Sequence, residues 1–144
     1  MSAEFSANAV QTVNPGQAIV FTSTDIPCGC GKIKHREGSG NFLVLGCSRS
    51  CNNSKSVDNI AVDFGANIAI PTGGTVGPIS VSLAIDGSNI ATTNMVVNPA
   101  AVEDYFNVSR ATNVGIWRGC CETVTVVNTS DQPILVQNAN IVFN

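Results

Sequence analysis

The chain contains the segment ISVSLAI at residues 79–85, in which large apolar side chains alternate with small ones. Apolar residues at every second position lie on one face of a β-strand, because successive side chains of a strand point to opposite faces. Asp86 and Gly87 follow directly, and glycine accepts the positive φ that tight two-residue turns require. The segment therefore predicts a strand with one buried face that ends in a hairpin.

The same period of two recurs elsewhere, at positions 60, 62 and 64, at 68 and 70, at 124 and 126, and at 134 and 136. Residues 71–78 (PTGGTVGP) and 128–133 (NTSDQP) are rich in turn formers. The second of these segments is predicted to reverse the chain between a strand at 122–127 and one at 134–143. Short strands separated by such turns are typical of β-sandwiches and barrels, so we predict an all-β fold.

Two segments depart from this pattern. Residues 99–106 (PAAVEDYF) offer the one helical alternative, a short helix with Asn98 as its N-cap; the other interpretation is a strand that begins near Val102. Residues 27–55 hold four cysteines, several glycines and serines, and most of the positive charge. For them we predict a loop-rich excursion around one strand at residues 41–45.

The composition agrees with strands and turns, and it excludes several classes of function. The length of 144 residues suits one domain. Valine (18), isoleucine (12) and threonine (11) outnumber leucine (4), while asparagine (16) and glycine (13) are abundant, which favours strands and turns over helices. Charged residues make up 12% of the chain and the net charge is -3, which argues against a nucleic-acid binder with a basic face and against a disordered acidic tail.

The chain shows no targeting or membrane segment. No apolar run approaches the length of a membrane span, so we expect no membrane partner. Residues 1–20 lack the basic start and apolar centre of a signal peptide. We therefore expect synthesis in the cytoplasm without an export signal.

Six cysteines stand in three groups, at Cys28 and Cys30, at Cys47 and Cys51, and at Cys120 and Cys121. Their even number suggests three disulfides; the alternatives are a zinc site that includes His35 and a set of buried thiols. The C-x-C and C-C spacings are awkward for one zinc tetrahedron. We predict that Cys120 or Cys121 pairs with one of the four earlier cysteines, which would tie down residues 27–51. Such bonds would form after release from the reducing cytoplasm.

The chain offers no catalytic set. His35 is the only histidine, and we interpret it as part of a surface strand and turn, with Arg36 and Glu37 as a local ion pair. No pair of carboxylates has a spacing typical of a glycosidase, and no phosphate-binding motif is present. We predict neither enzyme activity nor a cofactor or metal. Trp117 and Arg118 are a candidate contact for a sugar or partner; the alternative is an aromatic ring packed under a strand end.

Four segments resemble the TNF/C1q-like jelly rolls: residues 38–45 (GSGNFLVL), 62–70 (VDFGANIAI), 79–90 (ISVSLAIDGSNI) and 124–143 (VTVVNTSDQPILVQNANIVF). The likeness is in particular to the C-terminal domains of collagen-like spore-surface proteins and to stand-alone relatives in phages and prophages of Firmicutes. It covers residues 15–144. It implies a two-sheet jelly-roll sandwich that assembles as a homotrimer, and the mean hydropathy of +0.21 agrees with apolar surface buried between copies.

Residues 1–14 precede the resemblance, and we predict an N-terminal arm there with Phe5 and Val10 as exposed anchors. The chain lacks the Gly-X-Y collagen stalk of the spore-surface proteins and is richer in cysteine, which weakens a spore-coat role. The outward end of the particle-bound protein is expected to consist of loops 71–78 and 48–55.

The resemblance implies a non-enzymatic structural or binding subunit on the surface of a phage particle, as a capsid decoration, head fibre or fibre-tip module. One alternative is a spore-surface or extracellular filament subunit cross-linked by disulfides. Another is a carbohydrate-binding module that uses loop Asn and Asp side chains together with Trp117. The expected partners are further copies of the chain, other particle-surface or capsid proteins and, for a binding role, a host-surface glycan. The expected location is the virion surface.

Overall fold

The computed structural model describes residues 2–28, 32–46, 57–117 and 121–144. Within these ranges the chain forms twelve strands and one short 3-10 helix. The strands are β1 (Ala3–Ala7), β2 (Gln11–Val13), β3 (Ser23–Ile26), β4 (Ile33–His35), β5 (Phe42–Leu45), β6 (Val57–Ala69), β7 (Ile79–Ile85), β8 (Ser88–Asn89), β9 (Met95–Val97), β10 (Phe106–Trp117), β11 (Cys121–Asn128) and β12 (Ile134–Phe143). The helix, η1, spans Ala91–Thr93.

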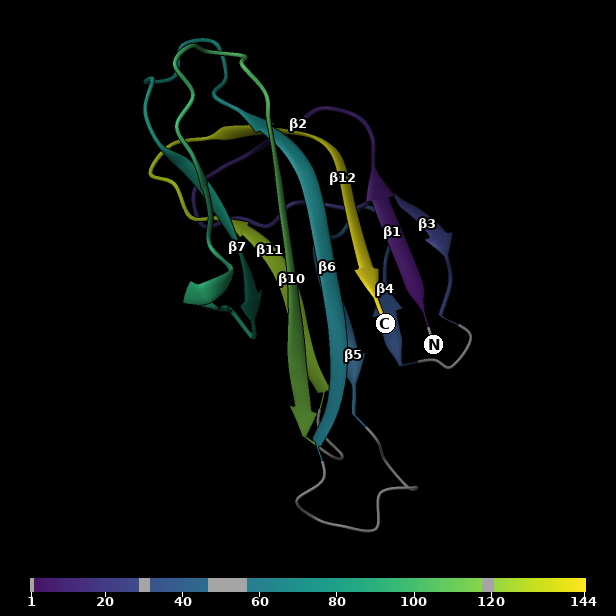
Figure 1. Ribbon diagram of the computed structural model, residues 1–144. Helices are drawn as coiled ribbons and strands as arrows, with labels where there is room; N and C mark the ends of the chain where they lie inside the picture. Colours follow the sequence, from purple (N-terminus) through teal and green to yellow (C-terminus); the bar gives the residue numbers. More distant parts are fainter. Residues whose placement is uncertain (1, 29–31, 47–56, 118–120) are drawn as a thin grey trace.

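The strands form two antiparallel sheets that pack face to face (Figure 1). Sheet A has the order β10-β6-β12-β1-β3, with β2 also paired to β12. Sheet B has the order β4-β5-β11-β7-β8, with β9 also paired to β7. The predicted all-β fold is confirmed. Among the described residues no helix is long and apolar enough to cross a membrane.

Period-two alternation places the core between the sheets. In β6 the side chains of Ile60, Val62 and Phe64 are buried, whereas Asn59 and Asp63 are exposed. The aromatic part of the core joins the N-terminal strand, β5 and the C-terminal strand. The ring centroids of Phe5 and Phe42 lie 4.9 Å apart, and those of Phe42 and Phe143 lie 5.1 Å apart. Such tilted contacts add to the stabilisation that burial of the rings provides.

The hairpin predicted after residues 79–85 is confirmed. Ile85 pairs with Ser88 in the ladder between β7 and β8, and Asp86 and Gly87 form the turn. Their φ angles are 51° and 84°, so both central residues adopt positive φ, as a type I′ turn requires.

The predicted helical segment at residues 99–106 is irregular up to Tyr105, and β10 begins at Phe106. Most side chains of residues 99–105 are exposed, so a helix there would have no apolar stripe to bury. The backbone N–H of Glu103 instead donates to the carbonyl of Ile70 at 2.7 Å, which holds this loop beside the loop at 71–78. The 3-10 helix lies at Ala91–Thr93, where none was predicted.

The predicted reversal at residues 128–133 is present, but the two strands that it joins do not pair. Strand β11 belongs to sheet B and β12 to sheet A, so the turn passes from one sheet to the other. Buried Asn128 organises it, because its side-chain amide donates to the carbonyls of Val13 and Gln132, both at 2.9 Å.

The N-terminal segment differs from the predicted arm. Strand β1 lies inside sheet A, between β12 and β3, and Phe5 pairs with Ile141. The prediction that Phe5 is an exposed anchor is wrong, since its side chain is 3% exposed and packs against Phe42 and Phe143. The sequence AEFSA alternates small or apolar residues with polar ones, as an inner strand of a one-sided sheet does. Val10 is 50% exposed, as predicted.

In the cysteine-rich segment, the strand predicted at residues 41–45 is confirmed as β5, which pairs with β4 and β11. The loop predicted at 48–55 lies outside the described residues.

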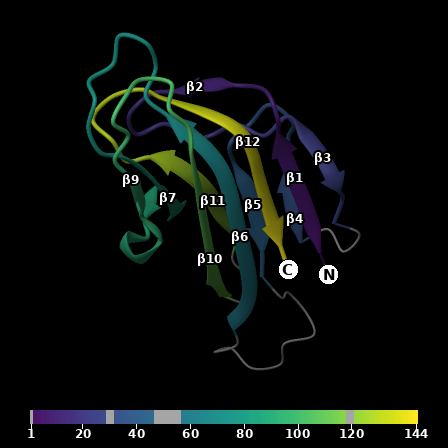
Figure 2. The same cartoon turned by 45° about the horizontal axis from the view of Figure 1, so that its top comes forward.

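The two ends of the chain lie close together at one end of sheet A (Figure 1). The loops at residues 71–78 and 98–105 stand at the opposite end of the sandwich, and a view turned by 45° shows the same arrangement (Figure 2). We call the part of the molecule that carries these two loops the loop end.

Candidate functional site

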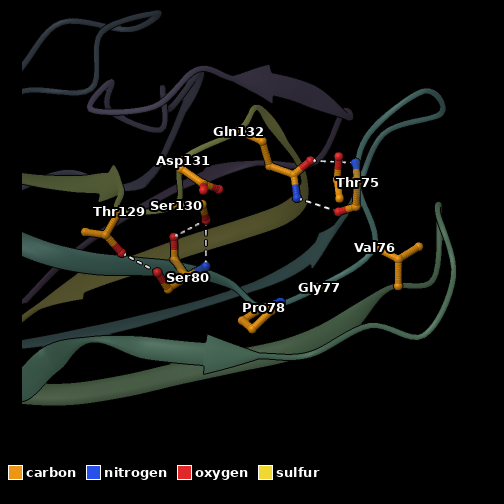
Figure 3. Close-up of a pocket in the computed structure, with 9 residues that line it drawn as sticks. All are labelled: Thr75, Val76, Gly77, Pro78, Ser80, Thr129, Ser130, Asp131 and Gln132. Carbon is orange, nitrogen blue, oxygen red and sulfur yellow. Dashed lines mark hydrogen bonds between the residues drawn. The ribbon is translucent and has the colours of Figure 1, made fainter.

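A groove of about 670 Å³ opens at the loop end, and we call it the end groove. It lies between the loop that precedes β7 and the turn between β11 and β12 (Figure 3). Its lining residues are Thr75, Val76, Gly77, Pro78, Ser80, Thr129, Ser130, Asp131 and Gln132. The first four belong to the loop that sequence analysis expected on the outward end of the molecule.

One wall of the end groove is held by a glutamine that acts like a strand partner. The backbone N–H of Thr75 donates to Gln132 Oε1 at 2.9 Å, and Gln132 Nε2 donates to the carbonyl of Thr75 at 2.7 Å (Figure 3). The loop is further closed by the N–H of Gly74, which donates to the carbonyl of Pro71 at 2.9 Å. The loop thus keeps a defined shape although it contains three glycines.

The floor of the end groove is a network of hydroxyl groups. Ser80 N–H donates to Ser130 Oγ at 2.8 Å, and Ser130 Oγ donates back to the carbonyl of Ser80 at 3.2 Å. Ser80 Oγ and Thr129 Oγ1 lie 2.6 Å apart, and Thr129 Oγ1 donates to Asn94 Oδ1 at 2.9 Å. These polar side chains therefore satisfy one another, which makes the groove a preformed surface rather than a reactive one.

The lining groups of the end groove that take no part in these hydrogen bonds are a carboxylate and an apolar rim. Asp131 is exposed and makes no hydrogen bond to another described residue through its side chain. Val76 and Pro78 are exposed beside it. Among the lining residues none is cationic, aromatic or a histidine. The end groove therefore presents one carboxylate and an apolar rim to a partner.

The side chain of His35 is half-buried against aromatic rings, whereas the sequence predicted a surface position. Its ring stacks on Phe42, with ring centroids 4.2 Å apart and planes 15° apart, and it meets the edge of Phe5 at 5.0 Å. Its Nδ1 lies 3.0 Å from the carbonyl oxygen of Asn41, and its Nε2 lies 3.1 Å from that of Phe21. Both ring nitrogens are thus engaged by the backbone, and neither faces a nucleophile.

The other predicted site residues are only partly described. Cys28 is half-buried and Cys121 is exposed. The remaining candidates, Cys30, Cys47, Cys51 and Cys120, lie outside the described residues, so the predicted pairing stays a prediction. The backbone of Trp117 pairs with Val57 at the end of β10, while the side chain of Trp117 and the whole of Arg118 lie outside the described part. No group of three potential metal-binding side chains occurs within the described ranges.

One carboxyl group has a perturbed acidity. The pKa of Glu122 is raised above its ordinary value of 4.5, first by burial and then by the negative charge of Asp86. Glu122 Oε2 is buried and makes no hydrogen bond to another described residue. Asp86 Oδ1 accepts the N–H of Thr123 at 2.9 Å, which holds the hairpin turn against β11. Glu122 and Asp86 therefore form a strained pair of like charges on sheet B, away from the end groove.

Sequence analysis missed the residues that shape the end groove, above all Gln132, Ser80 and Thr129. Each lies in a turn or strand that it did identify, but the contacts join positions about 50 residues apart in sequence. The one available signal was the concentration of Ser, Thr and Gln in the turn at residues 128–133.

Comparisons with known proteins concern the fold. No family model matches the sequence, and no characterised protein matches it at the level of sequence. Among solved structures the chain is similar to an Eiger TNF from S. frugiperda, with a TM-score of 0.69 and 11% identity over 99% of this chain and 90% of that one. It is also similar to the globular domain of a zebrafish complement 1qA protein, with a TM-score of 0.60 and 12% identity over 99% of this chain and 94% of that one. The protein therefore has the jelly-roll fold of TNF and C1q domains.

Proposed function

We propose that the protein is a non-enzymatic subunit on the surface of a phage particle, a capsid decoration, head fibre or fibre-tip module, and that it works as a homotrimer whose loop end contacts a partner. The jelly-roll fold and the absence of a base and nucleophile pair among the described residues support a binding or structural role. Fold alone does not specify the partner, so the proposal rests on the distribution of side chains over the surface.

The observation that carries the proposal is the gathering of exposed apolar side chains at the loop end. Val76 and Val102 are exposed in the two adjacent loops, and Phe106 is exposed where β10 begins. Val10, the remaining predicted anchor, is exposed in the bend between β1 and β2. Apolar side chains gathered on an exposed surface mark a contact site, whereas scattered ones do not. Since Phe5 is buried, the loop end rather than the N-terminal segment suits docking onto another protein of the particle.

The outward face of sheet A supports association of the chain with its own copies. Among the described outward side chains of β1, β6, β10 and β12, four of its six strands, only Glu4 and Asp63 carry a charge. These outward positions are Glu4 and Ser6 of β1, Asn59, Ala61, Asp63, Gly65 and Asn67 of β6, Asn107, Ser109, Ala111, Asn113 and Gly115 of β10, and Leu135, Gln137, Asn140 and Val142 of β12.

A face of this kind suits a closed ring. Around a threefold axis a side chain close to the axis meets its own copies, so a charge placed there would be repelled by the same charge on the two neighbours. Small, uncharged residues avoid that repulsion and permit close approach. The carboxylate of Glu4 accepts a hydrogen bond from Asn140 Nδ2 at 2.9 Å, which stabilises it but leaves its charge in place. The face also carries a row of amides, in which Asn107 Nδ2 donates to Asn67 Oδ1 at 3.2 Å.

The test has two parts. Mass spectrometry of purified virions from the source should detect the chain, and particles that lack it should bind the added protein. A Val76→Asp and Val102→Asp double variant should bind those particles at least about tenfold more weakly, because two apolar contacts become charged. Ile26→Asp is the matched control, since Ile26 is a comparably exposed apolar residue on β3, away from the loop end. Because Ile26 pairs with Glu4 on the outward face of sheet A, light scattering must first show that this variant keeps the mass of the parent protein.

Failure to find the chain in any virion preparation would refute the phage assignment. Disulfide-linked multimers on non-reducing electrophoresis would favour the spore-surface or extracellular filament alternative instead. Equal binding by the double variant and the parent protein would refute the role of the loop end.

A further inference from the structure

A second hollow lies on the side of the molecule, on the outward face of sheet B, and we call it the side hollow. Its volume is about 650 Å³, which is within the range of small-molecule sites, about 300–1,000 Å³. The lining residues are Gly16, Ala18, Asn41, Asp86, Gly87, Asn89, Thr123, Thr125, Val127 and Asn128. It shares no lining residue with the end groove.

Three parts of the chain build the side hollow. Strand β11 supplies the floor through Thr123, Thr125 and Val127. One wall comes from the segment around Ala18, which bridges to Val127, and the other comes from the hairpin turn that contains Asp86. The floor is thus a regular strand, and both walls are fixed to it by backbone pairing.

Two small residues of ISVSLAI lie beside the side hollow on the neighbouring strand β7. In the ladder between β11 and β7, Ser82 lies opposite Val127 and Ala84 lies opposite Thr125. Residues directly opposite in an antiparallel pair stand on the same face of the sheet. Ser82 and Ala84 therefore share the face of the side hollow, yet they are only 1% and 0% exposed.

The side hollow differs from the end groove in having unused hydrogen-bonding groups. Among the described residues, the side chains of Asn41, Asn89, Thr123 and Thr125 have no hydrogen-bond partner. Asp86 uses only Oδ1, for the N–H of Thr123. A separate observation points the same way: Ser82 Oγ is fully buried beside this floor and has no hydrogen-bond partner. Buried polar groups without a partner are rare in native proteins and call for an explanation.

We propose that the side hollow binds a neutral saccharide. The two amides and two hydroxyls both donate and accept, and the carboxylate of Asp86 accepts from hydroxyl groups. This mixture matches a ligand with several neighbouring hydroxyls. The lining contains no lysine, arginine or histidine, so it lacks the cations that would favour phosphate, sulfate or a carboxylate ligand.

A saccharide site would give the proposed surface subunit a ligand. This inference does not depend on whether the subunit belongs to a phage particle. It lies on sheet B, whereas the charge-poor face that suits self-association belongs to sheet A. A ring formed through sheet A would therefore leave the side hollow of each copy open to solvent. One trimer would then present three equivalent saccharide sites, which raises avidity for a surface that repeats its glycans.

The experiment uses the purified full-length chain on an array of neutral and anionic glycans, followed by calorimetric titration with the best-bound saccharide. We expect binding to neutral glycans only. Thr125→Val removes one hydroxyl at nearly constant volume, and Asp86→Asn removes the charge while keeping the oxygen that accepts from Thr123. Each should raise the dissociation constant about tenfold or more, as expected for a lost hydrogen bond, with the larger effect at the charged group.

Thr75→Val is the matched control, because it makes the same chemical change in the end groove, where the backbone of Thr75 and not its hydroxyl carries the contact. It should leave the dissociation constant unchanged. Thermal unfolding of every variant checks that the fold persists. The proposal is overturned if no neutral saccharide binds at millimolar concentration, if only anionic glycans bind, or if binding survives Thr125→Val and Asp86→Asn but is lost with Thr75→Val or Trp117→Ala. None of these outcomes bears on whether virions contain the chain.

Discussion

Gln132 pairs its side-chain amide with the backbone of Thr75 in both directions, with distances of 2.9 Å and 2.7 Å. The amide thereby makes the two backbone hydrogen bonds that a neighbouring strand would make to residue 75 in a sheet. Gln11 repeats the arrangement elsewhere: its Nε2 donates to the carbonyl of Val20, and its Oε1 accepts the N–H of Val20, both at 2.9 Å. Two irregular segments are therefore held by glutamines that imitate a β-ladder.

We predict that Gln132→Ala lowers the free energy of unfolding by about 1 kcal/mol, since it removes two hydrogen bonds that are partly accessible to water. The melting temperature should fall by about 2–4 °C for a domain of this size. Gln17→Ala is the control, because Gln17 is an exposed glutamine in the loop after β2 whose side chain bonds to no described residue. Equal melting temperatures for the two variants would show that the clamp on the loop at 71–78 contributes nothing.

The two N-terminal apolar residues should respond very differently to truncation. Phe5→Ala should lower the free energy of unfolding by about 3–5 kcal/mol, because it leaves a cavity among Phe42, Phe143 and His35. Val10→Ala should change it by less than about 0.5 kcal/mol, because half of that side chain already contacts water. Chemical denaturation measures both values. A Phe5→Ala protein as stable as Val10→Ala would contradict the place of β1 inside sheet A.

The strands and turns could be predicted where local sequence alone sets the geometry. The alternation in ISVSLAI and the Asp86-Gly87 turn both follow from backbone sterics over a few residues, and both are confirmed. The second half of β12 was harder, because the buried positions shift from 134 and 136 to 139, 141 and 143. A bulge with Asn138 at a φ of 54° absorbs the extra residue.

The parts that sequence analysis missed depend on distant partners. Whether β11 and β12 pair or lie in different sheets is decided by β1, β5, β6 and β7, which compete for their edges. Strand β1 is short, and its alternation fits an edge strand as well as an inner one, so its place between β12 and β3 depends on its neighbours. The side hollow and the end groove are likewise products of tertiary contacts, and no local motif marks either one.

The outward face of sheet A can be tested with an isosteric change of charge. We predict that Asn67→Asp shifts the proposed trimer towards monomer by at least about tenfold in dissociation constant, because the proposed contact face would then enclose a charge that has no partner. Within one subunit the new carboxylate still accepts the hydrogen bond from Asn107 Nδ2, so the fold should persist. Light scattering at several concentrations measures the mass, and higher salt should partly restore the trimer.

The matched control for this change is Asn89→Asp, which places the same charge on an exposed residue of sheet B. It should leave the assembly intact. Loss of the trimer with Asn89→Asp but not with Asn67→Asp would move the interface to sheet B. A parent protein that stays monomeric at micromolar concentration would remove the homotrimer from the proposed function altogether.

Glu122 gives a prediction about pH. Burial, reinforced by the charge of Asp86, raises the pKa of Glu122 above 4.5, so the folded chain holds this proton more tightly than the unfolded chain. The stability contributed by protonated Glu122 is therefore present at acid pH and is lost as the pH rises from about 4.5 through the raised value. Glu122→Gln should be more stable than the parent at pH 7 and equally stable at pH 3.

Denaturant titrations of the two proteins between pH 3 and pH 8 measure this difference. Asp86→Asn should show a smaller gain at pH 7 in the same direction, because it removes the second cause of the raised pKa of Glu122 and leaves burial in place. It also keeps an oxygen for the N–H of Thr123, so the hairpin turn is not weakened. A Glu122→Gln protein that is less stable than the parent at pH 7 would mean that the buried Oε2 has a partner in solution, and that the ionised carboxylate is favourable there.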